Sequence, residues 1–345
     1  MYTNLRKTSS WDSCTSATIA TSGKQGRTDL VLAVLESEMA KKRRFVIWAP
    51  NYNEQEGGSL VLHYLCHYLN AAGWDAFLWH KSKCLRKDLR SWSTRQAYLR
   101  KKLKRILRGV RPASPSLLTP VAREKHLEGA IVVYPEKVDG NPLCSARVVR
   151  WFLHKPGFHT GQVNYGENEL YFYYQKAFND HTLGKRTNSE LYFPVVLEHV
   201  FKQVNFGARA GTCYILRKGK DRPIQHDLRN GVVIDNMSNT EIARVFNQVE
   251  FCVSYDLYTF YSQYAAVCGC KSIVVPEPGL TKESWQPKAE LRYGVAYGEE
   301  DLEWAVNTRC KLLEALQQQQ QQAIAVVNRF AEKCCRFFCW GGDCH

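Results

Sequence analysis

The stretch 254–276, SYDLYTFYSQYAAVCGCKSIVVP, is the most informative part of the chain. An apolar strand over 250–254 leads into it. A helix is expected over 259–268, because Gly269 suits the left-handed conformation that ends helices. A second buried strand follows at once. The stretch therefore predicts one αβ step of a parallel sheet, and ligands of such sheets bind beyond the carboxyl ends of the strands.

Four polar residues lie at that expected edge. Hydroxyl groups beside a helix N-terminus suit an anion such as a diphosphate. The residues expected to bind it are Ser254, Asp256, Thr259 and Ser262.

A similar pattern opens the chain. An apolar strand over 45–50 is followed by a helix over 59–72 and a second strand over 74–79. The loop before the helix contains Gly57 and Gly58, which either form a simple turn or let phosphate oxygens approach backbone N–H groups. This βαβ opening predicts the start of a doubly wound sheet.

The remaining elements continue the alternation. Strands are expected over 130–135, 169–174, 211–216 and 232–235, and helices over 145–153, 238–246 and 324–338. Ser238 and Glu241 have the spacing of a capping box. A long helix is expected to start at 300 and to run into the glutamine tract 317–322, with the connection between the two halves over 191–204.

A chain of 345 residues accommodates two such domains. The expected organisation is a polar extension over 1–40, a first Rossmann-like domain over 41–205 with a basic insertion at 81–111, a second Rossmann-like domain over 206–322, and a C-terminal helix with a cysteine-rich tail over 323–345. The predicted fold class is α/β.

Over about residues 44–338, the order of elements resembles the GT-B class of glycosyltransferases, of a bacterial or phage type that acts on surface polysaccharides. The resemblance rests on Gly57-Gly58-Ser59, on Arg217-Lys218-Gly219-Lys220 and on the block 254–270. It implies two domains facing across a cleft, with a nucleotide-sugar donor held by the second. Arg217, Lys218, Gly57 and Gly58 would then contact the donor, while the alternative for the basic run is a solvated surface.

One position departs from this class. Tyr264 stands where the second acid of the donor block is usually found, so Gln263 or Ser262 would have to make the ribose contact that the resemblance implies.

A sugar acceptor hydroxyl needs a base to take its proton. Glu136 and Asp139 follow the buried strand 130–135 and are candidates, with Glu136 preferred because Asp139 begins a run with turn chemistry. Glu54 is a third candidate. His63 is more often a core histidine at such a helical position.

Positive charge is concentrated in one segment. Of the net charge of +14, the segment from Lys81 to Arg111 contributes +12, with 13 basic residues against the single acid Asp88. The predicted helix at 98–108 places leucines on one face and basic residues on the other, which fits an anionic membrane surface, nucleic-acid phosphates, or a helix docked on the core. The basic residues are Arg100, Lys101, Lys102, Lys104, Arg105 and Arg108.

No cofactor or metal is predicted. The 13 cysteines follow neither a disulfide framework nor a standard zinc site, so we expect reduced thiols, including Cys334, Cys335, Cys339 and Cys344 beside His345. Without a signal-peptide pattern or a spanning segment, the expected location is cytoplasmic, peripheral at the inner membrane face.

The predicted function is transfer of a sugar from a nucleotide-diphosphate sugar to a hydroxyl acceptor, a glycan or lipid-linked glycan. Two alternatives stay open. One is a DNA-modifying glycosyltransferase that uses the basic segment to bind DNA, and the other is a non-catalytic sugar-nucleotide or glycan-binding protein.

Overall fold

Apolar runs buried on both faces make the strands of the first sheet, as is usual for parallel strands covered by helices. The sheet has the order β2-β1-β3-β4-β5-β6, and all its pairings are parallel. Its strands are β1 (Arg44–Ala49), β2 (Asp75–His80), β3 (Ile131–Pro135), β4 (Val148–Phe152), β5 (Leu170–Tyr173) and β6 (Ser189–Glu190). Helix α2 (Gly57–Ala71) connects β1 to β2.

The structure is a computed structural model that describes residues 43–81, 85, 92–107, 114, 116–184 and 188–339. The expected N-terminal extension lies outside these residues. So do the end of the cysteine-rich tail and the segments on either side of the basic helix. Within that helix, the side chains of residues 101, 102, 105 and 106 are also outside the description.

The helix expected over 145–153 is wrong. Residues 148–152 form β4, which pairs with β3 and β5 and is fully buried. The run VVRWF is short and apolar apart from Arg150, and such runs do not distinguish a buried strand from a buried helix by periodicity. Its β-branched and aromatic residues favour the strand, and pairing on both edges settles it.

The second sheet has the order β11-β10-β9-β7-β8 and is also parallel throughout. Its strands are β7 (Thr212–Ile215), β8 (Gly231–Val233), β9 (Phe251–Ser254), β10 (Lys271–Val274) and β11 (Val295–Tyr297). Its helices are α4 (Asn239–Gln248), α5 (Tyr261–Val267) and the short α6 (Lys282–Trp285). The expected capping box at Ser238 and Glu241 is confirmed, and Gly269 after α5 has a φ of +103°.

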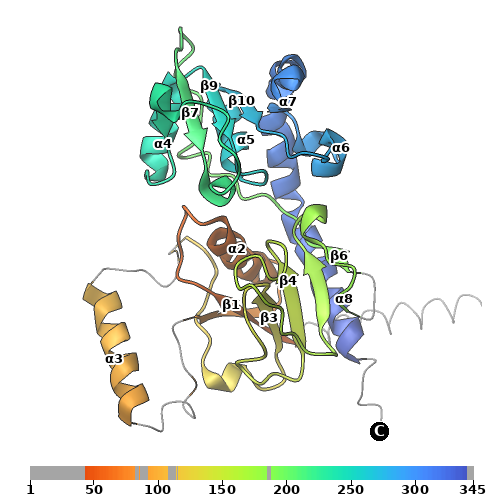
Figure 1. The fold of residues 1–345 in the computed structure, drawn as a ribbon. Helices are drawn as coiled ribbons and strands as arrows, with labels where there is room; N and C mark the ends of the chain where they lie inside the picture. The colour runs from red at the N-terminus through yellow and green to blue at the C-terminus, as the bar shows by residue number, and fades with distance from the viewer. Residues whose placement is uncertain are drawn as a thin grey trace, which may run out of the picture.

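The two sheets form two lobes that face each other, with α7 (Leu302–Gln321) running from the second lobe to the first (Figure 1). Helix α8 (Ala323–Cys339) then packs against α2 of the first lobe. Trp74 of the first lobe donates to Asn328 Oδ1 of α8 at 2.9 Å. The expected architecture of two Rossmann-like domains facing across a cleft, as in the GT-B class, is therefore observed. Helix α3 (Trp92–Leu107) stands apart from both sheets (Figure 1).

The connection between the lobes is anchored by Tyr264 of α5. Its hydroxyl donates to Val195 O at 2.9 Å and accepts from Leu197 N at 3.3 Å. Its ring stacks on Phe201 with centroids 4.1 Å apart. Tyr264 is therefore a structural contact between the second sheet and the connecting segment, which explains why a tyrosine occupies this position.

We predict that Tyr264→Phe lowers the free energy of unfolding by about 1–3 kcal/mol, because it leaves a buried carbonyl and a buried N–H without a partner. Urea unfolding followed by circular dichroism would measure the change. The control is Tyr293→Phe, whose hydroxyl makes no hydrogen bond within the described part of the chain. Equal stability of the two variants would contradict this role of Tyr264.

Candidate active site

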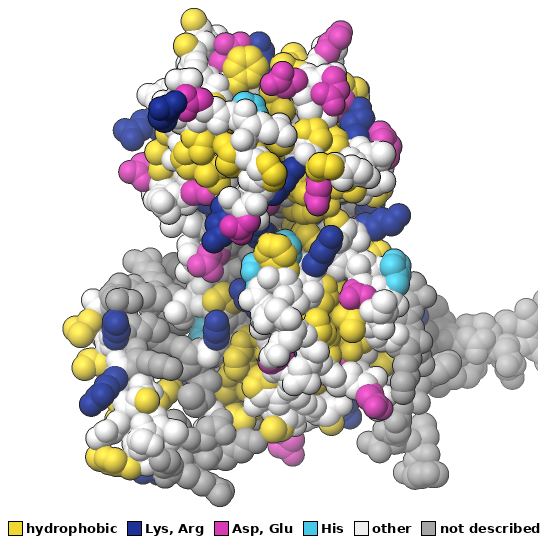
Figure 2. All heavy atoms as spheres, in the orientation of Figure 1, with side chains coloured by type: hydrophobic (Ala, Val, Ile, Leu, Met, Phe, Trp, Pro, Cys, Tyr) yellow, Lys and Arg dark blue, Asp and Glu magenta, His cyan; other side chains and the backbone are white. Residues whose placement is uncertain are grey.

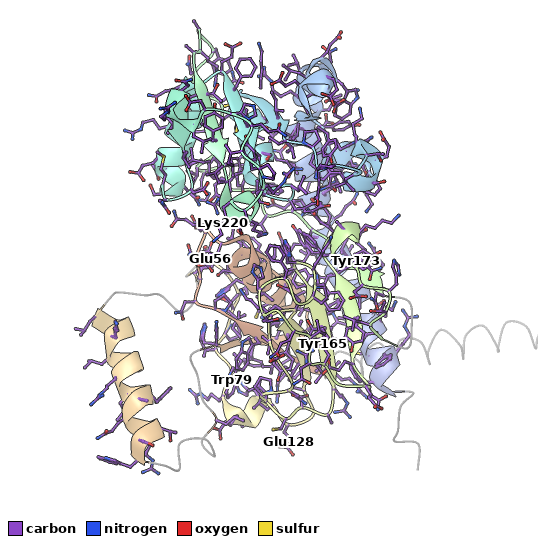
Figure 3. The ribbon with its side chains drawn as sticks, in the orientation of Figure 1. Glu56, Trp79, Glu128, Tyr165, Tyr173 and Lys220 are labelled. Carbon is purple, nitrogen blue, oxygen red and sulfur yellow. The ribbon has the colours of Figure 1, made fainter. Side chains whose placement is uncertain are left out.

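A pocket of about 360 Å³ lies between the carboxyl ends of the two sheets. The first lobe supplies residues 54–62, 135–137, 153–154, 159, 174–175, 178 and 195. The second lobe supplies 217–218, 256, 258–261 and 264. Figure 2 shows histidine and basic side chains gathered at the waist between the lobes, and Figure 3 labels Glu56 and Lys220 on opposite sides of this junction.

The N-terminus of α2 opens into this pocket. Neither Gly57 nor Gly58 has a positive φ, and a Cβ on either would meet at most Leu153, at 3.8 Å. The fold itself therefore does not require glycine here. A side chain would instead occupy the space from which a ligand reaches the first-turn N–H groups. This arrangement suits a phosphate at the helix N-terminus.

Arg217 and Lys218 follow β7 and line the opposite wall. The backbone N–H groups of Leu216 and Arg217 donate to Asp235 at 2.9 and 2.5 Å, and this holds Arg217 at a φ of +37°. Such a conformation is uncommon outside glycine, and such residues cluster at functional sites.

The Arg217 guanidinium lies over the ring of Tyr261, 4.1 Å from its centroid, and one of its nitrogens is 3.4 Å from Gln55 O in the first lobe. Asp235 was not among the expected site residues, because its contact with Leu216 and Arg217 depends on the pairing of β7 with β8.

The polar residues expected around 254–262 separate into two groups. Asp256 and Thr259 line the pocket. Ser254 does not, and its hydroxyl donates to Asp256 O at 2.8 Å within a tight turn. Ser262 is buried and borders a smaller neighbouring cavity together with Gln263. The structure thus places Ser254 in support of the loop, and Ser262 beside the pocket.

Glu136, which follows β3, is buried in the pocket wall and is 6 % exposed. Its Oε2 accepts from Leu153 N at 2.9 Å. Burial raises the pKa of this carboxyl, while the bond from Leu153 and the charges of Lys137 and Lys218 oppose the rise. A carboxylate with a raised pKa is a better base than an exposed one.

The other two candidate carboxylates differ in position. Glu54 lines the pocket and accepts from the Tyr52 hydroxyl at 3.1 Å. Asp139 is exposed, does not line the pocket, and accepts from Gln162 Nε2 at 3.0 Å. His63 is fully buried and pairs with Pro50 O at 3.0 Å, as expected of a core histidine.

A buried ion pair fixes the loop that begins with Glu136. The Arg150 guanidinium donates to Glu169 at 2.6 and 2.8 Å, and to the carbonyls of Val138 and Gly140 at 2.6 and 2.5 Å. Arg150 is fully buried in β4. Arg150 therefore holds this loop in place through the two carbonyls. Removal of Arg150 would also leave Glu169 as an uncompensated buried charge.

Two histidines of the pocket were not expected from the sequence. His154 is 7 % exposed, and burial together with the nearby charge of Lys218 lowers its pKa to about 3. The pKa of His159 is lowered by the same two causes. Both follow β4, and the misassigned helix over 145–153 hid the fact that they lie at the sheet edge.

In the described part of the chain, no three His, Cys, Asp or Glu side chains are placed to hold a metal ion. Cys344 and His345 lie outside the described residues. Among the described helices, none is long and apolar enough to cross a membrane.

No protein-family model and no curated protein matches the chain. Three solved structures are similar over 86 % of this chain and 97 % of theirs. They are T4 phage BGT with UDP-glucose (TM-score 0.39, 9 % identity), the DNA-modifying enzyme beta-glucosyltransferase with and without UDP-glucose (0.38, 7 %), and T4 phage beta-glucosyltransferase (0.34, 9 %).

We predict that His154 stays neutral well below its ordinary titration range, and that it makes the protein less stable to acid. The unfolded state binds a proton near pH 6.5 and the folded state only near pH 3. Stability contributed by the neutral ring is therefore complete above about pH 6.5 and is lost as the pH falls toward 3.

An NMR titration, with the His154 signal assigned by its absence in His154→Gln, would measure this pKa. A midpoint near 6.5 would contradict the prediction. A second readout is the slope of the unfolding free energy against pH between 4 and 6. In His154→Gln this slope should decrease by the equivalent of up to about one bound proton.

Proposed function

We propose that the chain is a glycosyltransferase that moves a sugar from a nucleotide-diphosphate sugar to a hydroxyl acceptor. The observation that carries the proposal is the composition of one pocket. It brings a buried carboxyl from the first lobe, Glu136, together with the cations Arg217 and Lys218 of the second lobe and the N-terminus of α2.

The cations and amides fit the donor diphosphate. As the bond between sugar and phosphate breaks, negative charge develops on the leaving diphosphate, and fixed donors at that place stabilise the transition state. Arg217 and Lys218 approach from one wall and the first-turn N–H groups of α2 from the other. Asp256 and Thr259 supply further polar contacts beside them.

Glu136 fits the acceptor side. The base must take a proton from the acceptor hydroxyl as that hydroxyl attacks the sugar, and a carboxylate in a desolvated wall performs this step efficiently. Glu136 is held by Leu153 N and belongs to the loop that Arg150 fixes. Glu54 is the second candidate, since it also lines the pocket, and Asp139 is the least favourable of the three.

Tyr264 in place of an acid would favour the alternative of a non-catalytic binding protein. The structure supplies another reason for that tyrosine, its hydrogen bonds to Val195 and Leu197. Tyr264 therefore does not favour loss of activity. The acceptor that we propose is a glycan or lipid-linked glycan of surface polysaccharide synthesis, reached at the cytoplasmic face of the inner membrane. A DNA acceptor is the second candidate, because the six basic residues of α3 also fit phosphates.

We expect Glu136→Gln to lower turnover by about 100-fold or more while donor affinity is kept, because a base acts in the transition state. Donor hydrolysis or transfer would be followed with a panel of nucleotide-diphosphate sugars, and donor affinity by calorimetry. The matched control is Asp139→Asn, a carboxylate on the same loop outside the pocket, with near-normal turnover expected. Near-normal turnover of Glu136→Gln would move the assignment to Glu54.

Replacing both Arg217 and Lys218 by Ala should raise the dissociation constant of a nucleoside diphosphate at least about tenfold, which corresponds to ~1.4 kcal/mol. The reason is the loss of two charge-assisted contacts to phosphate. Arg229→Ala serves as the control, since Arg229 is exposed and pairs with Asp227 away from the pocket. Unchanged binding by calorimetry, with an unchanged far-ultraviolet spectrum, would remove both residues from the donor site.

A further inference from the structure

Helix α3 combines features that the catalytic pocket does not use. Its sixteen residues, WSTRQAYLRKKLKRIL, contain six basic residues and no acid. Four of its large apolar side chains are exposed: Trp92 by 73 %, Leu99 by 60 %, Leu103 by 59 % and Leu107 by 78 %. A soluble surface helix normally turns such a stripe toward the core.

The exposed apolar residues form one stripe along the helix. They recur at intervals of seven, four and four residues from Trp92 to Leu107, which keeps them on one face at 3.6 residues per turn. By the same periodicity, Arg100 and Lys104 lie on one flank of the stripe and Arg95 on the other. Figure 2 shows hydrophobic and basic side chains together on the outer side of α3.

We propose that α3 docks the protein on the surface of an anionic lipid bilayer. Such a surface contacts both the apolar stripe and the basic flanks of the helix. The leucines and Trp92 enter the boundary between headgroups and acyl chains, while the flanking arginines and lysines lie at the level of the anionic headgroups. Tryptophan is itself favoured at this boundary.

The charges and the apolar stripe together favour a bilayer over a second copy of the chain and over a nucleic-acid duplex. A second copy of this chain would bring six like charges against six, without an acid on either helix to compensate. A nucleic-acid duplex would neutralise the basic residues but would leave the leucine stripe in water. An anionic bilayer is the partner that matches both the positive charge and the apolar face.

The location of α3 fits a role in acceptor capture. The helix follows β2 and therefore belongs to the lobe that carries Glu136. Docking through α3 would hold the acceptor side of the pocket near a membrane where lipid-linked glycans are found. This role rests on the proposed function, whereas docking itself does not, so it is tested without donor or acceptor.

The test is co-sedimentation of the full-length protein with vesicles of phosphatidylglycerol and phosphatidylcholine, and with vesicles of phosphatidylcholine alone. We expect binding to the anionic vesicles and at least about tenfold weaker binding to the neutral ones, because each basic residue near an anionic surface contributes several-fold to the partition coefficient. Equal binding to the two kinds of vesicle overturns the proposal, as does binding to neither.

Two variants separate the charges from the stripe. Arg100→Glu with Lys104→Glu should lower binding to anionic vesicles at least about 30-fold. The control Lys125→Glu with Lys202→Glu makes the same change in net charge at exposed positions outside α3 and should bind like the unchanged protein. Equal losses in the two double variants would show only a response to net charge, and would overturn the assignment to α3.

Leu99→Gln with Leu103→Gln keeps good helix formers and all the charges, and it should lower vesicle binding at least about tenfold through lost apolar burial. The same variant should leave binding to duplex DNA unchanged. If the unchanged protein binds duplex DNA more tightly than anionic vesicles at equal salt, and the leucine variant binds vesicles normally, the surface is a nucleic-acid interface instead. Circular dichroism would verify that each variant is folded.

Discussion

The site depends on two passages of the chain between the lobes, called crossings below. Together they hold the two sheets with the carboxyl ends of their strands facing each other. The first crossing is the segment after β6, anchored to α5 by the buried hydroxyl of Tyr264. The second is the passage from α7 into α8, which returns the end of the chain to the first lobe. A single flexible connection would let the lobes move apart. With two connections, the carboxyl ends of both sheets face one another, and the pocket forms between them.

These two connections bring a carboxyl group and an imidazole, whose pKa values are shifted in opposite directions, into one pocket. The junction excludes enough water that burial raises the pKa of the Glu136 carboxyl and lowers that of His154. Lys218, contributed by the other lobe, is close enough to act on both groups. Its charge favours an ionised Glu136 and a neutral His154, which is the pair of states that a base and an uncharged hydrogen-bonding partner need at neutral pH. Neither lobe alone would produce this electrostatic environment.

The sequence predicted the elements whose signals are local. The capping box at Ser238 and the glycine after α5 each fix an element end through contacts within a few residues. Strand β4 was missed because its five residues, four of them apolar, become a strand by pairing with two neighbouring strands, and the sequence of so short a run does not report that pairing. The error carried over to the site, since His154 and His159 lie just beyond β4.

Contacts between distant segments explain the other differences from expectation. The glutamine tract was expected only to extend a helix, and it is helical. Gln320 also accepts from Val196 N at 3.1 Å, and Gln317 donates to Glu198 at 3.0 Å. The tract thus ties one crossing to the other. Amide side chains suit this position because one accepts from the backbone N–H of Val196 and the other donates to the Glu198 carboxylate, and neither adds a charge at the junction. Composition alone gave no indication of this role, because the partners lie more than 100 residues away.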